Sequence, residues 1–166
     1  GTNKVITIKR GVKWQAAVCC NTERYGYSGS WAGGFLEFDA NRYGLLRGPK
    51  PKGRTLFANG VTPGWVHGGK LDDPRPRKLG PLPRDRAKYR GLYRHGNRVV
   101  LSYTVGETGV LDEPWAGDAD GRLFLTRTLE FGQASKPLTA VIAAKRGAKA
   151  VLQKIGDLAV ARVSGG

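Results

Sequence analysis

Four carboxylates cluster in an otherwise basic sequence, around a single tryptophan. They are Asp112, Glu113, Asp118 and Asp120, and Trp115 lies between the two pairs. Paired carboxylates can serve as acid and base in glycoside hydrolysis, and a tryptophan ring beside them can stack on a sugar. Asp112 with Asp118 or Asp120 is therefore the candidate catalytic pair.

The same acidic residues have two other interpretations. Carboxylate oxygens can hold Ca²⁺, but Asp118-Ala119-Asp120-Gly121 supplies only a fragment of the EF-hand spacing. The acids could instead lie in an exposed turn and pair with nearby arginines, with Gly117 and Gly121 allowing the turn geometry. We favour the turn, so the sequence leans away from an enzyme.

A second group of residues suits an anionic partner. Basic and aromatic side chains are interleaved over residues 84–98, and phosphate binding needs such a cationic surface. Period-two alternation divides these side chains between two strand faces, so we favour a solvated basic hairpin over a binding surface. Charge alone does not choose among acidic glycan, nucleic acid and an acidic protein surface. The candidate polyanion-binding residues are Arg86, Lys88, Arg90, Arg94 and Arg98.

A stiff, proline-rich run occupies residues 72–85. Proline fixes its own φ and restricts the residue before it, so this backbone is extended without regular structure. Four of its charged residues could form an ion-pair network that holds the run on a sheet, or they could be the rim of a binding site. These four are Asp73, Arg75, Arg84 and Asp85. For a sugar ligand, the candidate polar contacts are Arg75, Arg84 and Asp85, and the candidate stacking rings are Trp31, Trp65 and Trp115.

The histidines and cysteines do not suggest a metal site. Cys19 and Cys20 are adjacent, and His67 and His95 are the only histidines, so four zinc ligands would have to converge from three segments. The haem-attachment spacing CxxCH is absent. We predict no metal and no cofactor in this chain, and a haem could lie only in a neighbouring domain.

Length and composition point to one β-rich domain. The 166 residues carry a net charge of +15, with 40% hydrophobic residues, 25 glycines and 9 prolines. The glycine and proline content argues against a helical bundle, and no apolar run approaches the roughly 20 residues that span a bilayer. We expect a single β domain over residues 1–166, or a fragment of a larger one.

Alternating apolar residues predict the strands. Residues 91–105 are the clearest hairpin, with His95-Gly96-Asn97 at its turn. In residues 122–131, Arg127 interrupts the apolar face. The other alternating runs are residues 4–9, 14–20, 34–38, 138–143 and 158–163.

These runs predict an all-β fold. An antiparallel β-sandwich is the first choice and a barrel the second, with a long Pro/Gly/basic loop excursion over residues 47–90. In residues 98–105, we expect Val99, Leu101, Tyr103 and Val105 to face the core, because alternate residues share one face of a strand.

Five sequence motifs carry a resemblance to a known family. They are WAGGFLEF from Trp31, PGW from Pro63, DDPRP from Asp72, GPLPRD from Gly80 and YRGLYRHGNRVVLSYTVG from Tyr89. The chain resembles the uncharacterised domain of large secreted bacterial proteins that also carry c-type cytochrome modules and dehydrogenase-like or sugar-processing modules. The resemblance covers about residues 5–163. It implies a periplasmic or extracellular location and neighbouring domains, and it assigns no catalytic residue.

The function expected from these observations is that of a non-catalytic accessory or structural module of an exported, cytochrome-linked bacterial protein. It would bind glycan or pack against other domains or chains. The first alternative is a module that binds polyanions, either nucleic acid or acidic glycan, and the second is a carboxylate-dependent glycoside hydrolase. Exposed sheet edges could also pair two copies into a homo-oligomer.

Overall fold

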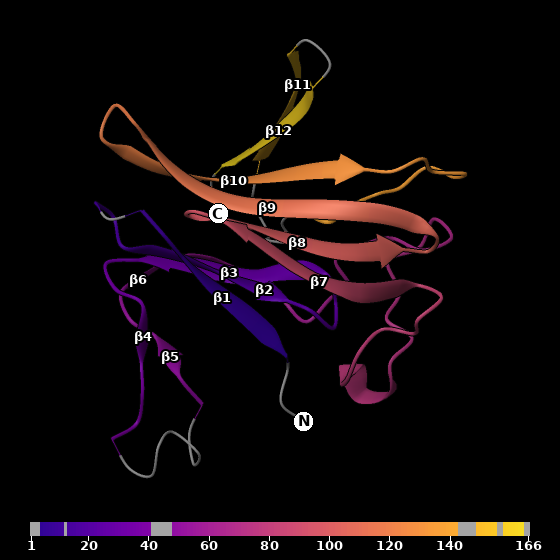
Figure 1. Ribbon diagram of the computed structural model, residues 1–166, viewed down its shortest axis with the longest axis horizontal. Helices are drawn as coiled ribbons and strands as arrows, with labels where there is room; N and C mark the ends of the chain where they lie inside the picture. Colours follow the sequence, from indigo (N-terminus) through magenta and orange to yellow (C-terminus); the bar gives the residue numbers. More distant parts are fainter. Residues whose placement is uncertain (1–3, 12, 41–47, 143–148, 156–157, 165–166) are drawn as a thin grey trace.

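The fold is built almost entirely from antiparallel strands. The computed structural model (Figure 1) describes residues 4–11, 13–40, 48–142, 149–155 and 158–164. Over these residues the only helical element is the short 3₁₀ turn η2 (Pro76–Lys78). None of the described helices is long and apolar enough to cross a membrane.

The first sheet contains four strands in the order β1-β2-β3-β6. They are β1 (Val5–Arg10), β2 (Ala16–Asn21), β3 (Gly26–Ala32) and β6 (Arg54–Ala58), and each pairs antiparallel with its neighbour. Glycine at position 29 permits the β3–β6 pairing, because a Cβ there would lie 2.8 Å from the carbonyl oxygen of Phe57.

The second sheet is a meander in the order β10-β9-β8-β7. Its strands are β7 (Ala87–His95), β8 (Arg98–Val105), β9 (Thr108–Ala119) and β10 (Arg122–Phe131). Two residues separate each consecutive pair of strands, and such short turns require residues with a positive φ angle. The turn residues with a positive φ are Gly96, Gly106, Asp120 and Gly121.

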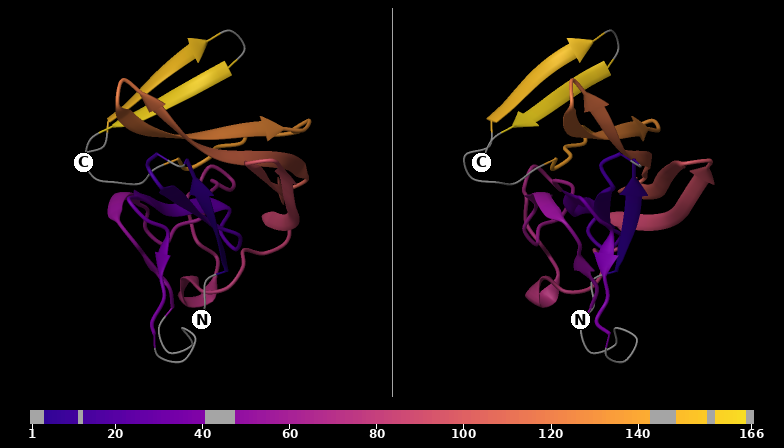
Figure 2. Two further views of the ribbon diagram at one scale, coloured as in Figure 1. Left: turned by 60° about the vertical axis from the view of Figure 1, so that its left-hand side comes forward. Right: turned by 90° about the vertical axis from the view of Figure 1, so that its left-hand side faces the viewer.

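Two small hairpins stand away from the sheets. β4 (Leu36–Glu37) pairs with β5 (Lys50–Pro51), and β11 (Lys149–Ile155) pairs with β12 (Leu158–Ser164). Figures 1 and 2 show them on opposite sides of the molecule, with β11–β12 beyond β10.

The core lies between the two sheets, where apolar side chains from alternate positions meet. β8 contributes Leu101, Tyr103 and Val105, which are at most 8% exposed, so the predicted core face of this strand is confirmed. The other members of the buried cluster are Ile8, Val18, Cys20, Tyr25, Tyr27, Trp65, Leu82, Ala87 and Val110.

The predicted antiparallel β-sandwich is confirmed, and the sheets do not close into a barrel. The hairpin at residues 91–105 and the strand at residues 122–131 form as expected, with Gly96 and Asn97 as the turn. Within the predicted loop excursion over residues 47–90, the structure adds β5, β6 and the first four residues of β7. Residues 138–142 form only an isolated bridge between Ala140 and Trp65, and residue 143 lies outside the described residues.

Candidate functional site

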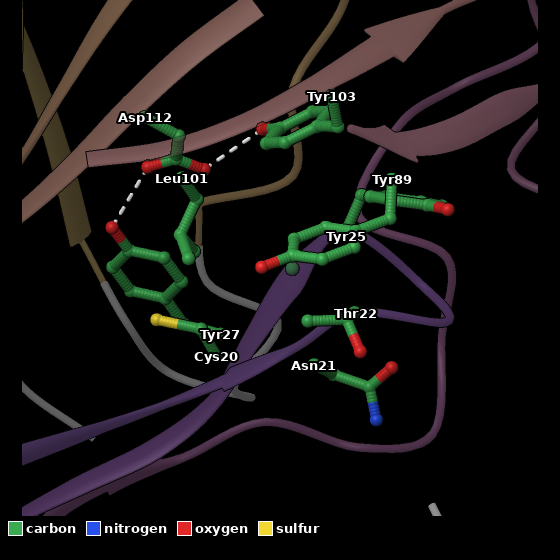
Figure 3. A pocket seen from close by; sticks show the side chains of 10 residues that line it. Cys20, Asn21, Thr22, Tyr25, Tyr27, Tyr89, Leu101, Tyr103 and Asp112 are labelled. Carbon is green, nitrogen blue, oxygen red and sulfur yellow. Dashed lines mark hydrogen bonds between the residues drawn. The ribbon is translucent and has the colours of Figure 1, made fainter. Parts of the chain in front are cut away.

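Asp112, the first candidate catalytic residue, is enclosed by a cation and two phenols. It lies on β9, is 1% exposed, and accepts hydrogen bonds of 2.8 Å from the hydroxyls of both Tyr27 and Tyr103. Arg127 of β10 donates to it from Nη2 at 2.7 Å and from Nε at 3.1 Å. Figure 3 shows the carboxylate between the two phenols.

Burial and the charge of Asp112 shift the pKa values of the two phenols and of Arg127. Burial raises the pKa of Tyr103 and of Tyr27, and the neighbouring Asp112 charge raises both further, so the two phenols stay protonated as donors. Burial alone would lower the pKa of Arg127, but the charge and hydrogen bonds of Asp112 outweigh it, and the net direction is upward. The cluster is therefore a closed ion pair in which Arg127 and the two phenols occupy the carboxylate of Asp112.

The two proposed partners of Asp112 are too distant for acid–base chemistry. Asp118 is six residues further along the same strand, which corresponds to roughly 20 Å at about 3.3 Å per residue. Glycosidase carboxylates lie about 5–10 Å apart with the sugar between them. Asp120 lies beyond Asp118, in the exposed turn that precedes β10. The geometry therefore gives no support to the hydrolase interpretation.

A small cavity adjoins the ion pair (Figure 3). Its volume is about 10 Å³, which is enough for about one water molecule and far below the volume of a sugar site. The residues that line it are Cys20, Asn21, Thr22, Tyr25, Gly26, Tyr27, Tyr89, Leu101, Tyr103 and Asp112.

The β7–β8 and β9–β10 hairpins separate near the middle of the second sheet. The β8–β9 ladder ends at the pair of Leu101 and Asp112, and β9 then continues with β10 alone as far as Ala119. Pro114 is the second residue of this half-paired stretch, and proline suits it because it has no N–H to donate to a ladder. Figure 1 shows the turns of both hairpins at the same end of the sheet. We call the opening between them the fork.

The fork contains a buried arginine, Arg10, and an ion pair in which the side chain of Arg98 is 60% exposed and that of Glu113 is 11% exposed. Arg98 binds the Glu113 carboxylate with both Nε and Nη2, at 2.8 and 2.5 Å. Arg10 enters from β1, donates to the carbonyl oxygens of Asn97 and Val99, and places its guanidinium 5.1 Å from the ring centre of Trp115. Trp115 is thus half-buried, with Arg10 over its ring.

Asp118, at the far end of β9, also has structural partners. Asp118 accepts a 2.7 Å hydrogen bond from the indole of Trp14 and lies 3.3 Å from the ammonium of Lys13. The hydrogen bond from Trp14 is the main reason that the pKa of Asp118 is lowered. The prediction that the acids pair with arginines is confirmed for Asp112 and Glu113. The prediction of an exposed turn is wrong for them, because both belong to β9.

Two of the three candidate stacking rings lie in the interior. Trp31 is 4% exposed and donates to the carbonyl of Phe35, and Trp65 is 5% exposed with its ring edge-on to Tyr103 and Phe131. Ring faces that pack on protein offer no platform to a sugar. Trp115 in the fork is the candidate stacking residue whose ring is partly exposed.

The proline-rich run is held by a buried ion pair. Arg75 is 5% exposed, and its Nε and Nη2 bind the carboxylate of Asp73 at 2.8 and 2.6 Å while Nη1 donates to the carbonyl of Gly80 at 2.7 Å. Of the four residues expected to form a network, the structure joins these two charged ones. Arg84 and Asp85 lie exposed outside the pair.

Low pH should weaken the ion pair of Asp73 and Arg75, over a pH range that follows from the lowered pKa of Asp73. Hydrogen bonds from Arg75 hold the pKa of Asp73 below its ordinary 3.8, so its stabilising contribution is complete above about pH 4 and is lost as the pH falls through the lower, folded-state pKa. We expect Asp73→Asn to reduce the loss of stability between about pH 4 and pH 2. Urea midpoints measured across this range test it, and Asp120→Asn in the exposed turn is the matched control. An unchanged acid profile in Asp73→Asn would contradict the prediction.

The five candidate polyanion-binding residues divide into two groups. Arg98 pairs with Glu113, and Arg86 lies 3.4 Å from the carboxylate of Asp72. Lys88, Arg90 and Arg94 are exposed on β7, and none of the described carboxylates pairs with them. These three cations are exposed along β7, but Lys88 lies on the face of Thr104 and Arg94 on the opposite face, with Val99.

The described residues contain no group of three or more histidine, cysteine, aspartate or glutamate side chains that could hold a metal ion. Both cysteines are free thiols, with Cys20 buried and Cys19 half-buried. Burial raises the pKa of each, which disfavours the reactive thiolate.

Sequence reasoning missed the two phenols and Arg10. Arg127 carried the available signal, because a cation on the apolar face of a strand needs a buried carboxylate. Tyr27 and Tyr103 resemble ordinary core aromatics in the sequence, and only the packing of the two sheets brings their hydroxyls to Asp112.

Comparisons with known proteins identify the family. Searches of curated proteins and of solved structures gave no match. Residues 18–112, which span β2 to the middle of β9, match the family described as a domain of unknown function (DUF6797). The match covers more than half of the sequence and includes Asp112 and the proline-rich run. The chain therefore belongs to the DUF6797 family.

Proposed function

We propose that this chain is a non-catalytic accessory module of an exported, cytochrome-linked bacterial protein involved in carbohydrate processing. Its role is to bind glycan or to pack against a partner domain. The motifs from Trp31 to the β7–β8 hairpin support the exported, multidomain setting through their resemblance to secreted proteins. A periplasmic or extracellular location is part of the same proposal.

The enclosure of Asp112 is the observation that carries the non-catalytic part. A general acid or nucleophile must reach its substrate, whereas this carboxylate is 1% exposed and bound by Arg127 and two phenols. The adjoining cavity holds about one water molecule. The polar groups of the acidic cluster thus support the fold.

The fork is the best-supported glycan surface. Trp115 offers a partly exposed ring, and the ion pair of Arg98 and Glu113 lies on the same stretch of sheet with donors and acceptors for hydroxyl groups. The guanidinium of Arg10 lies over the Trp115 ring and restricts its movement. Little side-chain entropy of Trp115 would therefore be lost when a glycan binds.

Polyanion binding is the second candidate, because a specific observation favours it. Lys88, Arg90 and Arg94 project from β7 without a described carboxylate partner, in a chain with a net charge of +15. Such a surface attracts any anionic polymer, and its affinity falls steeply with salt.

An array of neutral glycans, sulfated and uronic glycans, and single-stranded DNA and RNA distinguishes the candidates. We expect binding to one glycan class that persists at about 0.15 M salt, where exposed charges are largely screened. Trp115→Ala should weaken it at least about tenfold, as for other central aromatic contacts. The control Tyr93→Ala removes an aromatic ring that is 64% exposed on β7.

Each other outcome has a definite meaning. Salt-sensitive binding to every polyanion, unaffected by Trp115→Ala, would contradict glycan recognition and support the basic surface of β7. If the chain binds nothing on the array, packing against a partner domain would remain as its proposed role. Glycoside turnover by the purified chain would overturn the non-catalytic proposal.

A further inference from the structure

A rigid loop projects from the proline-rich run and presents two cations. We call residues 73–80 the clamped loop, because Arg75 closes it by bonding to Asp73 at one end and to the carbonyl of Gly80 at the other. The side chains of this ion pair are 1% and 6% exposed. A buried ion pair thus fixes a loop whose tip contains no buried residue.

The tip holds two consecutive residues in a conformation that costs free energy. Arg77 and Lys78 have φ angles of 53° and 56°, a left-handed region that long side chains rarely adopt. Both side chains are exposed, so burial does not offset this strain. Strained residues persist where the surrounding structure determines them, and they are concentrated at binding sites.

The clamped loop is also fixed to the body of the protein. Its C-terminal side continues to Leu82, which is 5% exposed and donates its N–H to the carbonyl of Glu23 in the β2–β3 turn. Figure 1 shows η2, the coiled ribbon of the loop, well away from both sheets. The loop is therefore preorganised and projects from the molecule, so docking would cost little ordering entropy.

The side chains around the tip select the chemistry of a partner. Leu79 directly follows the cations, and Leu71 precedes the clamped loop by two residues. They are 45% and 48% exposed, and residues 70–80 contain no aromatic ring. Glycans and single-stranded nucleic acids are bound largely by stacking on aromatic rings. Two cations beside two leucines instead complement a protein surface with carboxylates and apolar groups.

We propose that the clamped loop is a docking element for an acidic, partly apolar segment of a partner protein domain. This inference rests on the proposed accessory role and specifies its domain-packing form. Arg77 and Lys78 contact the partner's carboxylates, Leu71 and Leu79 cover its apolar side chains, and the pair of Asp73 and Arg75 positions the tip without touching the partner.

Charge reversal at the tip tests the proposal with a defined probe. The probe is a fluorescent twelve-residue peptide of alternating Glu and Leu, titrated with the full chain, beside a sulfated glycan and a single-stranded DNA of equal charge. We expect the double variant Arg77→Glu/Lys78→Glu to bind the peptide at least about tenfold more weakly, since like charges then face each other. The control Arg122→Glu/Lys136→Glu makes the same change in net charge at exposed sites outside the loop and should alter affinity less than about twofold.

Three results would overturn the inference. They are no binding of the peptide by the unaltered chain, equal losses in the two double variants, or tighter binding of the glycan or DNA than of the peptide. Circular dichroism of both variants checks that the fold is retained. Glycan binding without peptide binding would reject the docking loop and leave the glycan part of the proposed function standing, so the two failures are distinguishable.

Discussion

Replacing Arg127 with methionine is expected to lower the free energy of unfolding by about 3–5 kcal/mol, the usual cost of leaving a buried charge without its partner. The reason is that Asp112, 1% exposed between the sheets, would lose its cationic partner and keep only the two phenols as hydrogen-bond donors. Urea denaturation followed by tryptophan fluorescence measures the loss. Arg122→Met, at the exposed start of the same strand, should change stability by less than about 0.5 kcal/mol.

A double variant tests whether the stability loss in Arg127→Met comes from the unpaired charge or from lost packing. In Asp112→Asn/Arg127→Met, both charges of this ion pair are removed, and the amide oxygen of asparagine can still accept from a phenol. We expect the double variant to be at least about 1 kcal/mol more stable than Arg127→Met alone, since contacting residues of one network are coupled. Additive losses from the two substitutions would show that the ion pair does not determine the stability of this core.

The sequence predicts one half of this ion pair and misplaces the other. Period-two alternation in β10 correctly places Arg127 on the apolar face, because that strand is regular over all ten residues. Asp112 precedes Pro114 and lies among acids and glycines, a composition typical of turns. The position of Asp112 within β9 is set by the pairing of β9 with β8 and β10. This pairing joins residues that are distant in the sequence, so the local sequence around Asp112 does not reveal it.

The sequence also does not predict which tryptophan rings are buried and which are exposed. Tryptophan serves equally well as a core residue and as a sugar platform, and nothing in the local sequence separates Trp31 and Trp65 from Trp115. β3 was missed for a different reason: its Gly and Ser residues give no apolar alternation, yet Gly29 is required by the close approach of Phe57 in β6. The sequence therefore predicts the sheets better than it predicts which side chains stay accessible between and around them.

Gly64, in the PGW motif, is the position where a single methyl group should be most harmful. A Cβ there would lie 2.1 Å from the carbonyl oxygen of Tyr25 and 2.7 Å from Cα of Gly26, and both are backbone atoms. The same residue donates to Arg24 and accepts from Val141, each at 2.8 Å. Because the backbone on both sides is tied, a clash cannot be relieved by rotating a side chain.

We expect Gly64→Ala to lower the free energy of unfolding by about 3 kcal/mol or more, at the upper end for overpacking, since the chain must move away and carry the buried ring of Trp65 with it. Gly60→Ala is the matched control, because a Cβ at this glycine, four residues earlier, meets nothing within 4 Å. That variant should stay within about 0.5 kcal/mol of the unaltered chain. Equal urea midpoints for the two variants would mean that PGW does not require this backbone contact. A large difference between the two urea midpoints would show that Gly64 is needed for the loop of residues 59–65 to pack against the β2–β3 turn. The PGW motif would then have a structural role that does not depend on binding at the fork or the clamped loop.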